Sequence, residues 1–390
     1  MNSQIRRKKK ILFLIKSNSF AGTEKMLVAW LERIDYDLVD IVIISSMDII
    51  PVEIINRYNN KVKFITSNID KVKSILNWVA IISKYKPNSV IFMETWFIDY
   101  GLVSVFAAWL LTKGSVYMTE HSDIDSIEKS KMRLGIIPSF GFWKYPLTMR
   151  ALLCKKILAV SQGLKNKLVK YYNYPKNKIE VAYFPLDNRL YAPLNIPNNI
   201  IRTKYGISYN DIVVIVAARL VKEKGIDLII EAFGKLKEMT KRDDIWLWIV
   251  GNGENEFELK EMAINKGIAG RVIFLGYQKN VEDYLREANI YISASKIESF
   301  GIALLEAMSV GLVCIATSTC GSMEIMADKR FIVNYDPNEI YSKLDNILKM
   351  NKSEIKLMKQ NNREYVVNKY NKSEEIDKAL KILGIPITYE

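Results

Sequence analysis

The chain has 390 residues, of which 49% are hydrophobic and 25% charged. A chain of this length is too long for one ordinary hydrophobic core, and its apolar content is enough to bury two, so we expect two globular domains. The sequence contains no internal repeat of solenoid length and no low-complexity tract. The three cysteines are not spaced as metal ligands, which is typical of a reducing cytoplasm without disulfides. The apolar runs are too short for a secretory signal or a membrane-spanning helix, so we expect neither.

The positive charge is concentrated in the first half of the chain. Residues 1–185 contain 28 basic and 15 acidic side chains, a net charge of +13, whereas the remaining residues contain 28 of each. A basic domain beside a neutral one favours an anionic partner, such as a membrane surface, an acidic acceptor or nucleic acid. The same excess also fits a solvated, lysine-rich surface without a partner.

Short apolar runs alternate with helical patterns through this first half. Such alternation predicts a doubly wound α/β domain. We expect strands at 11–15, 41–45, 89–93, 115–119 and 156–160, and helices at 24–34, 102–112 and 162–172.

The loop 18–22 between the first strand and the first helix ends at Gly22. A strand, a glycine-containing loop and a helix together present backbone N–H groups to a phosphate. Because there is one glycine and no G-x-G-x-x-G pattern, this loop alone is a weak signal.

His121, the only histidine, follows the strand 115–119 at the edge where parallel sheets bind ligands. A side chain that titrates near neutrality fits a role in positioning a substrate or exchanging a proton, and it equally fits a structural cap. Asp123 and Asp125 come next and suit a divalent metal, but a turn followed by a helix cap is the favoured interpretation.

Residues 129–156 interleave basic and aromatic side chains. This mixture suits a membrane interface or a lipid-linked acceptor, and it would also suit single-stranded nucleic acid. Packing between loops is the structural alternative.

Residues 183–197 are rich in proline and asparagine, so we place the domain boundary there. The alternation then restarts and predicts a second doubly wound domain. Its expected strands are 212–217, 245–250, 271–275, 290–295 and 312–316.

The strand ends of the second domain carry polar and charged residues. Arg219 offers a bidentate fork for phosphate oxygens, and Lys224 offers a point charge five residues later. Tyr277 and Gln278 follow another strand, where they could meet a nucleotide base. A surface salt-bridge loop is the alternative for the two cations.

The stretch 298–306 is the strongest signal in the chain. The amides of Phe300, Gly301 and Ile302 lie at a predicted helix start, where a phosphate is favoured. Glu306 is the only charge in an apolar helix segment and needs a hydrogen-bonding partner, for which a ribose diol is suitable. Glu298 lies just outside the helix start, where a sugar beyond the diphosphate would sit. The alternative is a core helix with one glutamate facing water.

Together these residues resemble the retaining glycosyltransferases of family 4, which have the GT-B fold of two facing Rossmann-like domains with a cleft between them. The most specific part is Glu298-x7-Glu306 in ESFGIALLEAMSVG, with Arg219 and Lys224 upstream. Weaker matches are FAGTE at 20–24, TEH at 119–121, AVSQGLKNKL at 159–168 and FLGY at 274–277.

The resemblance implies a role for each residue. Arg219 and Lys224 would neutralise the donor diphosphate, Glu306 would hold the ribose, and Glu298 would hold hydroxyls of the transferred sugar. The amides of 300–302 would complete the phosphate site. From the first domain, Gly22 would approach the phosphate, and His121 would contact the sugar near the reacting carbon.

The resemblance also implies the domain bounds. We expect an acceptor-side domain at 1–186, a nucleotide-sugar domain at 187–368, and a last segment, 369–390, whose helix returns to the first domain. Three positions depart from the family pattern: Ala21-Gly22 replaces a glycine pair, Ala218 replaces the glycine before the phosphate-binding arginine, and Phe184-Pro185 replaces Asn-Gly. The third departure puts in doubt any acceptor role there.

The implied reaction transfers a sugar from a nucleotide diphosphate, with UDP favoured, to a hydroxyl of a lipid-linked or polysaccharide acceptor in bacterial surface glycan synthesis. Neither a metal nor a cofactor is expected, because cations and helix starts would stabilise the leaving group. The expected location is the cytoplasm, peripherally on the inner face of the membrane. No nucleic acid partner is expected.

Two other functions remain open at this stage. One is a nucleotide-sugar epimerase or a phosphorylase on a similar fold, although no pyridoxal-type lysine motif supports a phosphorylase. The other is a non-enzymatic anion-binding protein that contacts membrane or nucleic acid, which leaves the paired glutamates unexplained.

Overall fold

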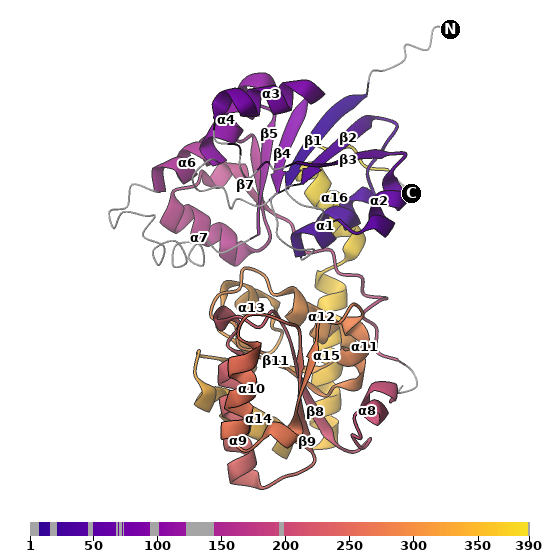
Figure 1. Cartoon of the computed structure of the whole chain (residues 1–390), viewed down its shortest axis with the longest axis vertical. Helices are drawn as coiled ribbons and strands as arrows, with labels where there is room; N and C mark the ends of the chain where they lie inside the picture. Colours follow the sequence, from indigo (N-terminus) through magenta and orange to yellow (C-terminus); the bar gives the residue numbers. More distant parts are fainter. Residues whose placement is uncertain are drawn as a thin grey trace. The chain divides into compact units, whose positions relative to one another are not determined.

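The computed structural model describes residues 8–15, 22–45, 50–67, 69, 72, 74–93, 101–121, 144–194 and 199–388. The chain divides into two compact units (Figure 1). Unit 1 comprises 1–185 and 373–390, and unit 2 comprises 186–372. The expected boundaries lie after residues 186 and 368, and the units are divided after residues 185 and 372.

A parallel sheet forms the centre of unit 1. Its order is β3-β2-β1-β4-β5-β6-β7, so the direction of winding reverses between β1 and β4. The inner strands are buried on both faces, which is why β1 is a continuous apolar run rather than an alternating one. The strands are β1 (Lys9–Ile15), β2 (Val39–Ser45), β3 (Val62–Thr66), β4 (Ser89–Met93), β5 (Val116–Glu120), β6 (Lys156–Ala159) and β7 (Ile179–Val181).

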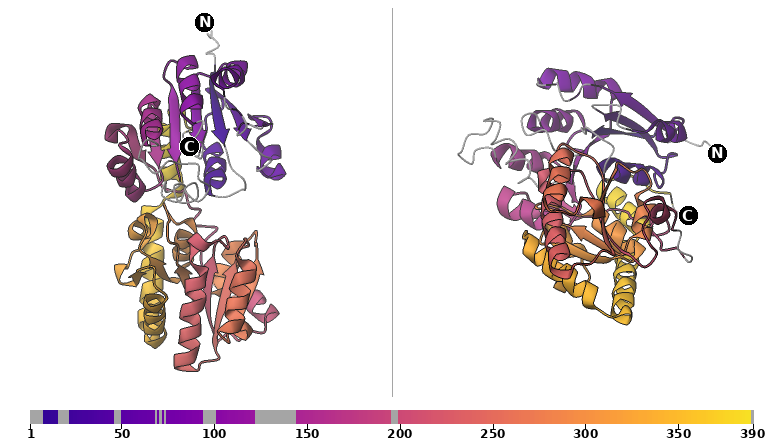
Figure 2. Two further views of the ribbon diagram at one scale, coloured as in Figure 1. Left: turned by 60° about the vertical axis from the view of Figure 1, so that its left-hand side comes forward. Right: turned by 60° about the horizontal axis from the view of Figure 1, so that its bottom comes forward.

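Helices cover both faces of this sheet (Figures 1 and 2). One layer contains α3 (Ile75–Tyr85), α4 (Gly101–Leu111), α6 (Lys144–Leu153) and α7 (Gln162–Tyr172). The other contains α1 (Gly22–Leu31), α2 (Val52–Tyr58) and α16 (Lys372–Ile382). The chain end is fixed beside α1, because Arg33 pairs with Asp377 at 3.0 Å and the amide of Asp35 donates to the carbonyl of Pro386.

A buried polar cluster ties α6 to the end of β5. Arg150 donates to Glu120 at 3.1 Å and to the hydroxyl of Tyr174 at 2.8 Å, and that hydroxyl donates to Glu120 at 2.9 Å. The side chains are almost fully buried, so the two charges depend on one another for stabilisation.

Unit 2 has a second parallel sheet, with the order β10-β9-β8-β11-β12-β13. Its winding reverses between β8 and β11. The strands are β8 (Ile212–Ala217), β9 (Ile245–Val250), β10 (Val272–Gly276), β11 (Ile290–Ser293), β12 (Val313–Thr317) and β13 (Ile332–Val333). The layer with α9 (Ile226–Thr240) also contains α10 (Glu256–Asn265) and α14 (Pro337–Lys349). The opposite layer contains α8 (Ile200–Lys204), α11 (Val281–Glu287), α12 (Ile302–Val310) and α15 (Lys352–Lys369).

The predicted fold class, two doubly wound α/β domains, is confirmed, and each predicted strand has an observed counterpart within two residues at either end. Three observed strands were not predicted: β3, β7 and β13. All three lie at sheet edges. Edge strands are short and partly exposed here, so they lack the continuous apolar run that identifies the inner strands.

Glycines at the carboxyl edge of the unit 2 sheet allow its loops to pack backbone against backbone. A Cβ on Gly225 would lie 2.1 Å from the carbonyl oxygen of Ala294, and one on Gly321 would lie 1.9 Å from that of Phe300. The loop after β9 does the same, because a Cβ on Gly251 would lie 1.9 Å from the oxygen of Ala218. Gly225 and Gly251 also have positive φ angles of 61° and 130°.

We therefore predict that Gly225→Ala and Gly321→Ala each destabilise unit 2 by roughly 2–4 kcal/mol, because a carbonyl must move to admit the methyl group. Gly270→Ala is the matched control, since its Cβ would meet nothing within 4 Å. Urea unfolding followed by tryptophan fluorescence measures the three changes. Equal midpoints for all three variants would contradict the packing argument.

Candidate active site

Three predicted site residues of unit 2, Arg219, Lys224 and Glu298, lie on the loops where its winding reverses. In a doubly wound sheet, ligands bind beyond the carboxyl ends of the two strands at that point. Here those strands are β8 and β11, which pair in parallel. The loop after β8 carries Arg219 and Lys224, and the loop after β11 carries Glu298. The amide of Lys296 donates to the carbonyl of Glu223 at 2.8 Å, so the two loops are joined directly.

Lys224 and Glu298 form an ion pair, with Nζ and Oε2 2.6 Å apart. The hydroxyl of Ser295 lies 3.5 Å from the same oxygen. Both charged side chains keep about a fifth of their surface exposed, 21% and 24%. A pair in this position contributes roughly 1 kcal/mol or less, so an incoming diphosphate can compete for the ammonium group.

Arg219 is exposed at the same edge. Within the part of the chain that the structure describes, its guanidinium makes no hydrogen bond or ion pair. Its loop is held by the backbone instead, since the amide of Leu220 donates to the carbonyl of Asn252 at 2.9 Å. The fork of Arg219 is therefore available to an anion without breaking an internal contact.

Two helices begin at this edge without a side-chain cap. Helix α12 starts after Gly301, whose φ is 103°, and α9 starts after Gly225. The first-turn N–H groups of a helix have no partner within it, and its dipole is positive at that end. By contrast, α13 (Cys320–Ile325) is capped by Thr319 and Ser322. The uncapped start of α12 is where the amides of Phe300, Gly301 and Ile302 were predicted to bind phosphate.

Glu306 is buried within α12, only 5% exposed, which excludes the alternative of a glutamate facing water. The hydroxyl of Tyr191 donates to its Oε1 at 2.7 Å. Sequence analysis identified the need for a partner but not Tyr191, which lies 115 residues earlier. The pKa of Tyr291 is raised well above its usual value, mainly by burial and then by the Cys314 thiol and the carboxylates of Glu306 and Glu298.

Tyr277 and Gln278 follow β10, next to β9 in the sheet. Tyr277 is 68% exposed. Gln278 turns its side-chain amide to the carbonyl of Leu275 at 2.5 Å. The exposed phenol ring thus offers a stacking surface, whereas the amide of Gln278 is already occupied within the loop.

His121 and Gly22 belong to unit 1. His121 directly follows β5, and Gly22 is the first residue of α1. The His121 ring nitrogen Nε2 lies 2.8 Å from the hydroxyl oxygen of Thr119, and that hydroxyl donates to the carbonyl of Phe92 at 3.4 Å. Because the threonine proton is used there, Nε2 donates and Nδ1 is left as an acceptor. Burial lowers the pKa of His121 to about 3, so the ring is neutral.

Several predicted features lie outside the described residues. These are Phe20 and Ala21 of the first loop, Asp123 and Asp125, and most of the basic and aromatic segment 129–156, of which 144–156 is described. Among the residues that are described, no three His, Cys, Asp or Glu side chains are grouped to hold a metal.

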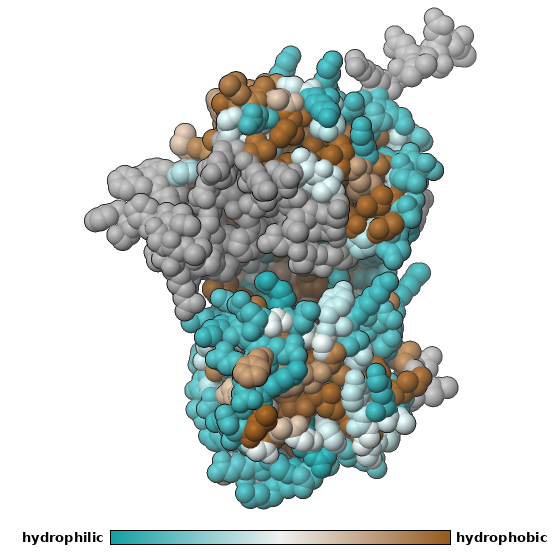
Figure 3. All heavy atoms as spheres, viewed as in Figure 1, coloured by the Kyte–Doolittle hydropathy of each residue, from teal (hydrophilic) through white to brown (hydrophobic). Residues whose placement is uncertain are grey.

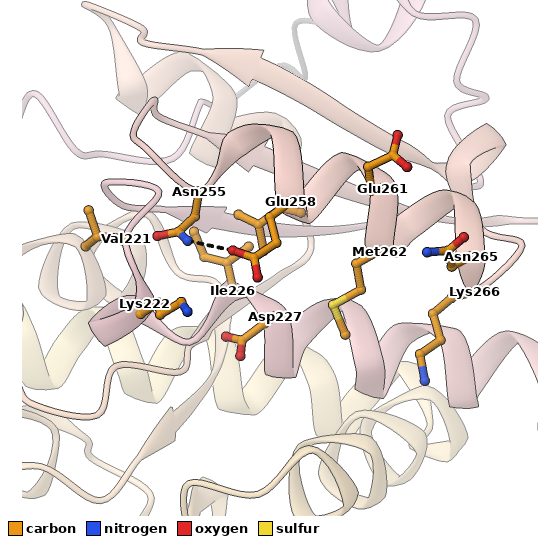
Figure 4. A pocket seen from close by; sticks show the side chains of 11 residues that line it. Val221, Lys222, Ile226, Asp227, Asn255, Glu258, Glu261, Met262, Asn265 and Lys266 are labelled. Carbon is orange, nitrogen blue, oxygen red and sulfur yellow. Dashed lines mark hydrogen bonds between the residues drawn. The ribbon is translucent and has the colours of Figure 1, made fainter.

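A cavity of about 430 Å³ lies between the start of α9 and the length of α10, from Asn255 to Lys266 (Figure 4). Ile226, Leu259 and Met262 line it, and Asn255 donates to Glu258 at 2.9 Å at one side. The predicted residues Arg219, Lys224, Glu298 and Glu306 do not line it. This cavity is therefore separate from the ion pair, although both adjoin the loop after β8.

The neutral state of His121 predicts a pH dependence of stability. In the unfolded chain His121 binds a proton below its ordinary pKa of 6.5, whereas in the folded chain it stays neutral down to about pH 3. Protons therefore favour the unfolded chain, and the free energy of unfolding falls as the pH falls below 6.5. Relative to a His121→Asn variant, the wild type should lose about 2 kcal/mol of unfolding free energy between pH 7 and pH 5. Urea unfolding at both pH values tests this. If the difference in unfolding free energy between the wild type and His121→Asn is the same at both pH values, the ring has its ordinary pKa in the folded chain.

The chain is similar to known proteins in sequence and in fold. Residues 197–365 match the family model described as glycosyl transferases group 1. The N-acetyl-alpha-D-glucosaminyl L-malate synthase of Bacillus anthracis is 32% identical over 44% of this chain and 43% of its own length, so the chain spans less than half of that relative. The UDP-Gal:alpha-D-GlcNAc-diphosphoundecaprenol alpha-1,3-galactosyltransferase of Escherichia coli is 22% identical over 80% of this chain and 79% of the relative.

Among solved structures, Anabaena Alr3699/HepE in complex with UDP and glucose matches with a TM-score of 0.77 at 18% identity. The match covers 96% of this chain and 99% of that chain, so the fold is shared over both units. The match to the group 1 glycosyl transferases thus covers most of unit 2, and the chain as a whole has the GT-B fold.

Proposed function

We propose that this protein is a retaining glycosyltransferase of family 4, which moves a sugar from a nucleoside diphosphate, with UDP favoured, to a hydroxyl of a lipid-linked or polysaccharide acceptor in bacterial surface glycan synthesis. The observation that carries the proposal is the Lys224–Glu298 ion pair at the reversal point of the sheet, beside two uncapped helix starts. The E. coli relative is named for a UDP-sugar and a lipid diphosphate, and HepE was solved with UDP.

Unit 2 supplies the groups that bind the donor in this proposal. Arg219, Lys224 and the amides of 300–302 face the diphosphate, where their preorganised positive charge stabilises the leaving group, and no metal is needed for that purpose. Glu298 binds sugar hydroxyls beside Lys224, and Glu306 binds the ribose. Tyr277 offers its ring to the base.

The residues of unit 1 have roles that rest on the resemblance alone. Gly22 contacts the phosphate, and His121 contacts the sugar. The neutral ring of His121 offers Nδ1 as an acceptor to a sugar hydroxyl rather than a proton to the leaving group.

The reaction itself breaks the bond between the anomeric carbon and the diphosphate oxygen. The acceptor oxygen forms the new bond on the same face of the sugar, and its proton passes to the leaving phosphate. The protein then needs no nucleophile of its own. Its contribution is orientation and charge stabilisation.

Lys224→Met should lower kcat/KM for sugar transfer by at least roughly 100-fold, because it removes a charge at the leaving group. Lys222→Met is the control, since it removes the same charge two residues away and should change kcat/KM less than about threefold. A panel of UDP-, GDP- and ADP-sugars is tested with lipid diphosphate, oligosaccharide and hydroxy-acid acceptors, the last because of the relative named for L-malate. Equal rates in the two variants, or no transfer in the panel, would overturn the proposal.

We also propose that unit 1 binds an anionic membrane surface peripherally. Helix α4 has no charged residue, yet Phe106, Trp109, Leu110 and Leu111 are each 38–51% exposed. Figure 3 shows apolar side chains gathered over α3 and α4. Among the described residues, no helix is long and apolar enough to cross a bilayer. An exposed apolar helix in a unit of net positive charge suits the interface of an acidic membrane.

Vesicles containing phosphatidylglycerol should therefore sediment the wild type more strongly than vesicles of phosphatidylcholine alone. Trp109→Ser combined with Leu110→Ser should weaken binding by at least about tenfold. The reason is that moving each apolar side chain from water into the membrane interface contributes roughly 1.5–3 kcal/mol to the binding free energy. Phe257→Ser is the control, since Phe257 is 77% exposed on α10 of the neutral second half. Equal binding by both variants would refute the role of α4.

A further inference from the structure

The hydroxyl of Tyr191 donates a hydrogen bond to Oε1 of Glu306 at 2.7 Å. Both side chains are at least nine-tenths buried, with 7% of Tyr191 and 5% of Glu306 exposed. A buried carboxylate must be hydrogen-bonded, so a phenol bonded to Oε1 helps to fix the direction in which the carboxylate faces.

The backbone around Tyr191 is held in place by two arginines. Arg363 of α15 donates to the carbonyl of Tyr191 at 3.2 Å and to that of Ser309 on α12. Arg286 of α11 donates to the carbonyl of Ala192 at 3.0 Å and to that of Leu190. The segment 190–192 is thus tied to three helices of unit 2. The position of the phenol relative to α12 is therefore fixed by main-chain contacts.

The protonation states suit a permanent hydrogen bond. Burial, together with the negative charge of Glu306, raises the pKa of Tyr191 above its usual value of 10. The phenol therefore remains a donor throughout the physiological range. An ionised carboxylate offers about four acceptor positions, more than one phenol uses.

We propose that Tyr191 is a positioning residue that orients the Glu306 carboxylate toward the ribose diol and so sets the preference for ribonucleotide over 2′-deoxyribonucleotide donors. This inference rests on the proposed function, because it requires a nucleoside diphosphate at α12. Tyr191 touches no reacting atom in this scheme. It acts through Glu306.

The test compares nucleoside diphosphates that differ by one hydroxyl. UDP, GDP and ADP are first titrated into the full-length protein by calorimetry, and the tightest binder is then compared with its 2′-deoxy counterpart. The wild type should prefer the ribonucleotide by at least about tenfold, as expected for a hydrogen bond to a charged group. Tyr191→Phe should reduce that preference to roughly threefold or less, mainly by lowering the affinity for the ribonucleotide.

Two further variants make the result decisive. Glu306→Gln should abolish the preference, because the carboxylate itself is lost. Tyr174→Phe removes the same kind of buried hydrogen bond, from a phenol to the carboxylate of Glu120, in unit 1, and should leave the preference unchanged. Melting temperatures confirm that each variant is folded.

The outcomes separate the two proposals. Failure of the wild type to bind any nucleoside diphosphate would overturn the proposed function. An unchanged preference in Tyr191→Phe, with the preference lost in Glu306→Gln, would overturn only the role of Tyr191. An equal fall in affinity for both nucleotides would assign Tyr191 a purely structural role and would also overturn the inference.

Discussion

The close backbone contact between the loops at the carboxyl edge of the unit 2 sheet determines the rest of its site. Gly225 lies against the carbonyl of Ala294, and Gly321 lies against that of Phe300, with no room for a Cβ at either position. These contacts bring the start of α9, the start of α12 and the loop after β11 together. Lys224 and Glu298, which are 74 residues apart, can then form their ion pair. The two glycines allow this close backbone contact because they have no Cβ atom.

The same edge gathers positive electrostatic potential from main-chain and side-chain sources. Two helices begin there at glycines in the left-handed region, and a glycine has no side-chain oxygen with which to cap the first N–H groups. Helix α13, which starts nearby in sequence, has its own hydroxyl cap and lacks this capacity. The difference between capped and uncapped starts distinguishes a structural helix from one that can receive an anion. The ion pair with Glu298 holds the ammonium of Lys224 at this edge.

The sequence predicted most of this arrangement because its main signals are local. Strand β8 was predicted with the observed bounds, since a strand buried on both faces is an unbroken apolar run. Arg219, Lys224 and Glu298 could be selected because each follows such a strand. The edge strands β3, β7 and β13 gave no such run. The bond from Tyr191 to Glu306 was not predictable either, because its partners are 115 residues apart and only the folded chain brings them together.

The two halves of the chain differ in how their positive charges are arranged, and a count of lysines does not show this difference. The half of the chain after residue 185 has equal numbers of acidic and basic residues, yet it contains the cations and helix starts suited to a diphosphate. A ligand bound there would depend on a few oriented groups, because a domain with zero net charge produces little long-range attraction and salt screens exposed charges beyond about 8 Å. The net charge of +13 belongs to the other half, where it is dispersed and suits attraction to an extended anionic surface rather than to one small ligand. Removing Lys224 and removing a surface lysine of unit 1 are therefore different experiments, although each deletes one positive charge.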